Sequence, residues 1–148
     1  MTERVAILHF ASPPVIGGVE STIYYHAIGL HKLGYAVRVI SGAGANFAPG
    51  IETIIDPLYG SKHPDVLSVK AELDAGHVTP AFEALTTRLR ALLADHLIDC
   101  DVCIAHNVHT LHKNIPLSAA LASLAQQGPP HQIAWCHDLA WTNIQYQD

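Results

Sequence analysis

Charged residues are scarce in this sequence, and cations are the scarcest. Asp, Glu, Lys and Arg together make up 14% of the 148 residues, and only 8 of them are Lys or Arg, so the formal net charge is −5. So few cations do not form the basic surface that binds a phosphate backbone, and we expect no nucleic-acid partner. Apolar residues reach 49%. This share favours a sheet covered by helices on both faces, or a face that meets another domain.

Long apolar runs and a leader peptide are also missing. No run approaches the roughly 20 residues that span a bilayer. The first residues, MTERVAILHF, lack the basic region and the small-residue cleavage site of a signal peptide. The 3 cysteines therefore indicate free thiols in a reducing compartment, and we expect a cytoplasmic protein.

Short apolar runs alternate with helical patterns along the chain. The runs predict strands at 4–10, 36–41, 51–55, 101–106 and 132–137. Apolar residues at helical spacing predict helices at 19–33, 80–97 and 116–128. The segment 56–79 is looser, with one short helix expected near its middle. This order predicts a single α/β domain over residues 1–148, with a doubly wound, mostly parallel, Rossmann-like sheet and helices on both faces.

A glycine pair, Gly17-Gly18, separates the first strand from the first helix. Unpaired N–H groups at a helix start attract anions, and the missing Cβ atoms let a ligand or another chain approach the backbone. A tight turn without any ligand would also explain the pair. The later stretch SGAGANFAPG lacks the third glycine of a dinucleotide fingerprint, because Phe47 takes that position, and no phosphate-binding P-loop motif occurs. We therefore interpret this stretch as a turn-rich loop.

Cys100 and Cys103, followed by His106, His109 and His112 at three-residue spacing, suggest a zinc site as an alternative. Residues three apart on an extended strand point to opposite faces, so the two thiols should not share a metal ion. A redox Cys-x-x-Cys pair would need a helix start that is missing here. We expect buried thiols and no metal.

Three short motifs follow the first, fourth and fifth predicted strands. They are PPVIGGVES, the pair His106-Asn107, and CHD, which contains His137 and Asp138. In this order and spacing they resemble the N-terminal half of the retaining GT-B glycosyltransferases that use nucleotide-sugar donors, of the glycosyltransferase family 4 type. The resemblance covers essentially all 148 residues. It implies two Rossmann-like domains across a cleft, of which the N-terminal one mainly binds the acceptor and the C-terminal one binds the donor.

The resemblance also implies a role for each motif. Gly17 and Gly18 would present backbone amides to the donor diphosphate or to the transferred sugar. His137 would be catalytic and touch the transferring sugar. Helix N-terminal amides stabilise a leaving diphosphate without a metal, so no cofactor is expected besides the nucleotide-sugar co-substrate. Asp138 is expected chiefly to orient its loop. The residues expected on the acceptor side are His106, Asn107, Asp138 and Trp141.

The expected partners are a nucleotide-sugar donor and an acceptor that the sequence does not identify, whether glycan, lipid or small molecule. The donor-binding domain, with its pair of glutamates, is not part of this sequence, so the chain is expected to be a truncated portion of a longer enzyme and inactive alone. Many relatives act on lipid-linked acceptors, which leaves peripheral membrane contact open. No polybasic segment supports such contact. The exposed inter-domain face is expected to promote self-association.

Two alternatives remain at this point. One is a non-catalytic Rossmann-like or flavodoxin-like binding domain, which a gene ending at Asp148 would favour. A gene continuing for another couple of hundred residues, with a glutamate pair in a second Rossmann-like domain, would favour the transferase. The other alternative, a sugar-nucleotide-modifying enzyme such as an epimerase, is disfavoured because it leaves the His106-Asn107 and CHD motifs without a role.

Overall fold

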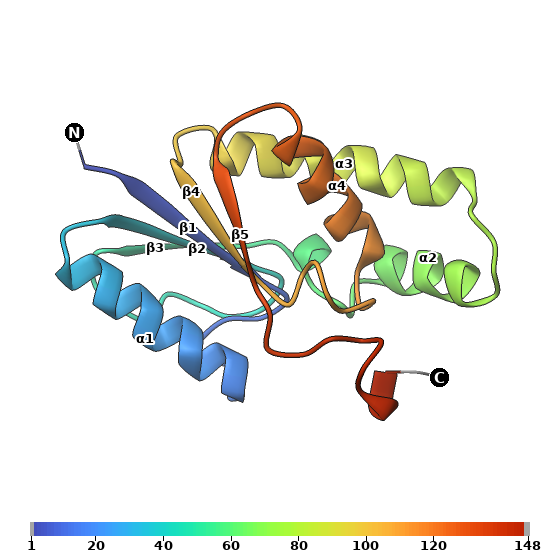
Figure 1. Cartoon of the computed structure of the whole chain (residues 1–148), viewed down its shortest axis with the longest axis horizontal. Helices are drawn as coiled ribbons and strands as arrows, with labels where there is room; N and C mark the ends of the chain where they lie inside the picture. The colour runs from blue at the N-terminus through green and yellow to red at the C-terminus, as the bar shows by residue number, and fades with distance from the viewer. Residues whose placement is uncertain (1, 147–148) are drawn as a thin grey trace.

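A five-stranded parallel sheet forms the centre of the protein (Figure 1). The computed structural model describes residues 2–146. The strand order is β3-β2-β1-β4-β5, so the chain starts in the middle, fills one half of the sheet and then crosses to the other. This α/β arrangement confirms the predicted Rossmann-like fold class. The strands are β1 (Arg4–His9), β2 (Ala36–Ser41), β3 (Ile51–Ile55), β4 (Val102–His106) and β5 (His131–Trp135).

One face of the sheet is covered by a single helix, α1 (Gly18–Lys32). Its buried residues Ile23 and Ala27 pack against the side chains that β1, β2 and β3 direct to this face. The helix ends because Gly34 adopts a φ of +95°, a left-handed conformation that glycine takes without steric cost. The helix therefore begins and ends close to the predicted positions.

The other face is covered by three helices. Four leucines at helical spacing bury one side of the longest of them, in agreement with the predicted amphipathic pattern. The short helix expected near the middle of the looser segment is confirmed: it has eleven residues, with Pro64 in its first turn and the ring of His63 accepting a hydrogen bond from the Asp65 N–H. The helices on this face are α2 (Pro64–Asp74), α3 (Pro80–Leu97) and α4 (Ile115–Ala125).

Smaller elements and boundaries refine the sequence prediction. Two 3-10 turns occur, η1 (Pro57–Tyr59) and η2 (Ile144–Tyr146). The segment 42–50 forms turns without a helix, as predicted. Within residues 2–146, no helix combines the length and the apolar character needed to cross a membrane.

The prediction that Cys100 and Cys103 point to opposite faces was wrong. Both thiols lie in the same core cluster beneath α3 and α4. The reason is that β4 begins only at Val102, so Cys100 is not part of the extended segment to which the parity rule applies. Both cysteines are buried, as expected.

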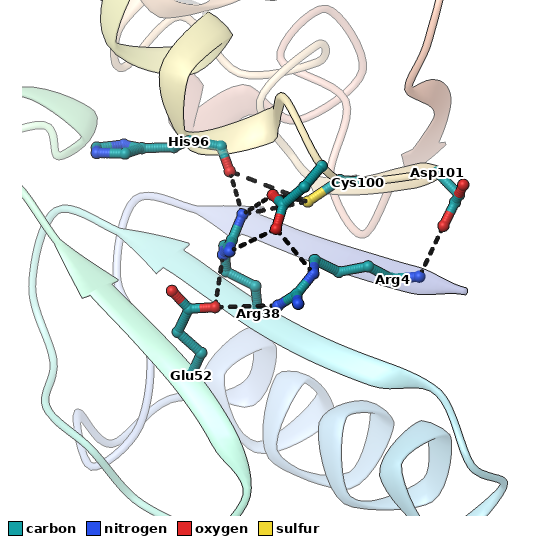
Figure 2. A network of polar contacts seen from close by, with 7 residues as sticks. Arg4, Arg38, Glu52, His96, Cys100 and Asp101 are labelled. Carbon is teal, nitrogen blue, oxygen red and sulfur yellow. Dashed lines mark hydrogen bonds and ion pairs between the residues drawn. The ribbon is translucent and has the colours of Figure 1, made fainter. Parts of the chain in front are cut away.

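A network of ion pairs and hydrogen bonds joins the strands near their amino ends (Figure 2). The Arg38 guanidinium donates to Glu52 at 2.8 Å through Nε and to Asp99 at 2.6 Å through Nη1. Arg4 reaches the same two carboxylates, at 3.2 Å and 3.1 Å. Its backbone N–H also donates to the Asp101 carboxylate. Three strands and the segment that joins α3 to β4 are therefore tied together at this end.

Candidate functional site

Three aromatic side chains end adjacent strands at the opposite, carboxyl edge of the sheet. His9 ends β1, His106 ends β4, and Trp135 ends β5. The His106 and Trp135 rings stack at 5.8 Å between centroids, and His9 Nδ1 lies 2.8 Å from the His106 carbonyl oxygen. Ligands of open α/β sheets bind outside this edge of the strands. The histidines are therefore placed where chemistry is expected.

His106 and His137 form a pair of imidazoles in direct contact. His106 Nδ1 lies 2.9 Å from His137 Nε2, and the rings stack at 5.1 Å. Burial, helped by the neighbouring His137, lowers the pKa of His106 to about 3, so this ring is neutral at physiological pH. His106 is fully buried, whereas His137 lies exposed in the loop that follows β5. The contact fixes Nε2 of His137 and leaves Nδ1 as its nitrogen for a ligand.

Asn107 holds the loop that carries His137 and Asp138. Its Oδ1 accepts hydrogen bonds from the backbone N–H groups of His137 at 2.8 Å and of Asp138 at 3.1 Å. Its Nδ2 lies 3.4 Å from Asp138 Oδ2. Asn107 itself has a φ of +60°, and asparagine is among the few non-glycine residues that tolerate this region. Asn107 thus acts as a positioning residue, and the predicted acceptor contacts of His106, Asn107 and Asp138 stay predictions.

Gly17 and Gly18 mark the start of α1, as the sequence predicts. No side chain caps this helix start. The Glu20 carboxylate folds back into the space that a Cβ at Gly17 would fill. A negative charge near a helix N-terminus is favourable, which explains this position. An anion that approaches Gly17 must therefore displace the Glu20 carboxylate or bind beside it.

The sequence reasoning missed His9 and Glu20. His9 donates its Nδ1–H to the His106 carbonyl, so a neutral ring keeps the lone pair on Nε2, which lies 3.9 Å from Glu20 Oε1. Burial lowers the pKa of His9, which favours that neutral form. Its signal in the sequence is its place near the carboxyl end of the first predicted strand, 4–10. Through these contacts Gly17 is linked to the histidine pair.

Trp141 lies farther along the loop after β5 and is 65% exposed. The loop is anchored nearby, because the Ala140 N–H donates to the Thr110 carbonyl at 3.0 Å. The segments after β4 and β5 therefore lie side by side. The predicted acceptor-side role of Trp141 stays a prediction.

The cysteines and histidines do not form a metal centre in the part of the chain that is described. Among residues 2–146, no group of three or more His, Cys, Asp or Glu side chains is arranged to hold a metal ion. Burial raises the pKa of Cys103 to about 12, which disfavours the thiolate that a metal or a redox partner would need. His26 packs against Trp135 and His106 through ring contacts.

A comparison with protein-family models finds no match, and a comparison with curated proteins finds no significant similarity. Function is therefore inferred from the residues and their geometry. The carboxyl edge of the sheet offers an uncapped helix start, an exposed and oriented imidazole, and a neutral buried histidine behind it. Such groups can bind an anion and donate or accept hydrogen bonds to hydroxyl groups.

Proposed function

We propose that this chain is the acceptor-side domain of a retaining glycosyltransferase that uses a nucleotide-sugar donor. The observation that supports this most is the orientation of His137, whose Nε2 contacts the buried His106 and whose backbone is held by Asn107. An exposed imidazole fixed on two sides at the ligand edge of a parallel sheet is suited to touching a reacting sugar.

The proposed mechanism needs charge stabilisation more than an acid–base pair. In a retaining transfer without a protein nucleophile, the acceptor attacks the face of the sugar from which the diphosphate leaves, and a leaving-phosphate oxygen takes the acceptor proton. Backbone N–H groups at the start of α1, beside Gly17 and Gly18, stabilise the charge that develops on the diphosphate. His137 hydrogen-bonds a hydroxyl of the transferring sugar through Nδ1.

Glu20 adds a condition to this proposal. Its carboxylate lies beside Gly17 and would repel a diphosphate that entered the same space. Its side chain is long and contacts Gly17 with its flexible end, so rotation removes it at little cost. The donor is then held mainly by a second Rossmann-like domain, and this chain contributes the glycine loop and His137.

The test measures sugar transfer by a protein in which this chain is followed by a donor-binding domain. His137→Ala is expected to lower kcat by about a hundredfold or more. His77→Ala is the matched control, because His77 is exposed in the loop between α2 and α3, and it should leave kcat unchanged. Normal turnover by His137→Ala would contradict the catalytic role. Turnover by the 148-residue chain alone would contradict the division of labour between two domains.

A further inference from the structure

A cavity of about 530 Å³ lies beside the candidate site and has no role in the mechanism above. It opens between the carboxyl end of β1, the turns after β2 and β3, and the start of α2. Its size suits a small organic molecule of one or two rings. The ionisable residues in its lining are His9, Glu20, Lys62, His63 and Lys113.

Two of the cations in this lining have no acidic partner among the described residues. Of the 8 Lys and Arg residues, Arg4, Arg38, Lys70 and Arg88 each form an ion pair with a carboxylate. The remaining four are Lys32, Lys62, Arg90 and Lys113. Two of these four line one cavity, in a chain whose net charge is −5. Half of the Lys and Arg residues that form no ion pair within residues 2–146 thus line a single cavity.

Lys113 lies in the segment after β4 and lines the cavity. It also lies over the Tyr146 ring at 5.8 Å, and a cation–π contact keeps the ammonium available for an anion. A lysine ammonium is a compact positive charge that binds phosphate readily.

The lining also contains two hydrogen-bond acceptors. His9 donates its Nδ1–H to the His106 carbonyl, so the neutral ring has an acceptor at Nε2. The Glu20 carboxylate is an acceptor only. These two acceptors lie 3.9 Å apart, beyond hydrogen-bond distance of each other. Neither has a hydrogen-bond donor among the described residues, and the hydroxyl groups of a polyol are donors that both can accept.

We propose that this cavity binds a polyhydroxylated compound that carries a phosphate monoester. Lys62 and Lys113 bind the phosphate, while His9 Nε2 and the Glu20 carboxylate accept hydrogen bonds from hydroxyl groups. Neither lysine belongs to the motifs that suggested the transferase. The inference rests on the proposed function only in identifying this compound as the acceptor of the sugar.

The test is calorimetric titration of the 148-residue chain with glucose 6-phosphate and with glucose. We expect the phosphate ester to bind and Lys62→Ala/Lys113→Ala to weaken binding by about tenfold or more, with glucose binding far more weakly. Lys32→Ala/Arg90→Ala removes the same charge from the two unpaired cations outside the cavity and should leave the affinity unchanged. Lys62→Gln/Lys113→Gln keeps side-chain bulk without the charge, and thermal unfolding shows that each variant is folded.

A second titration uses vesicles that contain phosphatidylinositol 4-phosphate, whose head group offers the same chemistry. Lysine-dependent binding of either source supports the inference, and the tighter source tells whether the natural ligand is soluble or lipid-borne. The inference is overturned if neither source binds at millimolar concentration, if glucose binds as tightly as its phosphate ester, or if both double variants weaken binding equally. These results involve no donor and no transfer, so they are independent of the His137 experiment.

Discussion

The two edges of the sheet differ in whether their polar groups have partners. Near the amino ends of the strands, Arg38 and Arg4 share the carboxylates of Glu52 and Asp99, so each charge has a partner. Near the carboxyl ends, Lys62 and Lys113 have no carboxylate, and His106 Nε2 is buried without a hydrogen bond among the described residues. The first edge is built for stability. The second edge has polar groups without partners among the described residues, and these groups can bind a ligand.

The difference follows from burial as well as from charge. The Arg38 side chain is only 10% exposed, and a cation so placed is tolerated because all three guanidinium nitrogens donate hydrogen bonds, to Glu52, to Asp99 and to the His96 carbonyl. His106 is also buried, but it avoids the cost of a buried charge because its lowered pKa keeps the imidazole neutral. A buried charge that is paired stabilises one geometry, whereas a buried neutral imidazole can hold a neighbour without competing for a ligand's charge.

The largest effect is expected at the paired edge. Arg38→Ala removes the group that joins β2, β3 and the segment after α3, so that the Glu52 and Asp99 carboxylates keep their contacts with Arg4 but lose those with Arg38. We expect the free energy of unfolding to fall by about 2–4 kcal/mol, measured by denaturant titration. Arg90→Ala, an exposed cation without an ion pair, should change it by less than about 0.5 kcal/mol. Equal effects of the two substitutions would show that the network does not stabilise the fold.

A smaller loss of stability is expected on substitution of Asn107, which holds the loop after β5 at the carboxyl edge of the sheet. Asn107→Gly keeps the positive φ but removes the amide that holds His137 and Asp138, and should cost about 1–2 kcal/mol of unfolding free energy. Asn107→Ala should cost about 1 kcal/mol more, because a Cβ without a local hydrogen bond is unfavourable at this φ. The same denaturant titration separates the two effects. Identical stabilities for the two variants would mean that backbone strain contributes nothing there.

A third test distinguishes the edges by pH. His106 binds a proton near pH 6.5 when unfolded but only near pH 3 when folded, so its contribution to stability is complete above about 6.5 and falls on acidification between these values. The slope is at most about 1.4 kcal/mol per pH unit. Hydrogen bonding to Arg38 lowers the pKa of Asp99, so that contribution is lost only below about pH 4.

Unfolding titrations at a series of pH values check this order. His106→Gln should flatten the dependence between pH 6.5 and about 4, and Asp99→Asn should flatten only the part below. A wild-type stability that is constant between pH 6.5 and 4.5 would contradict the neutral state assigned to His106.

The sequence predicted most of the fold because its elements are locally encoded. The runs RVAILHF and AVRVIS are apolar and of strand length, and α3 repeats leucine at helical spacing. The helix α2 was expected without bounds because only Val66 and Val69 of its eleven residues are buried, so its apolar periodicity is weak. Strand β5 ends two residues before the predicted position, which moves His137 from a strand into a loop.

The site was only partly predictable, for a related reason. His106, Asn107, His137 and Asp138 come from two short motifs, and adjacent parallel strands bring their ends together. The Arg38 network and the cavity lining join residues far apart in the chain, from Arg4 to Asp99 and from His9 to Lys113. No local pattern signals such contacts, because they depend on strand order and on the path of loops.

The most direct measurement is nuclear magnetic resonance mapping of the labelled 148-residue chain during titration with glucose 6-phosphate. If the carboxyl edge binds ligands and the amino edge is structural, the shifting amides will be those around His9, Lys62 and Lys113, and the amides of Arg38 and Asp99 will stay unchanged. Shifts centred on Arg38 and Asp99, with none around the cavity, would contradict the division of the molecule into a closed edge and a binding edge.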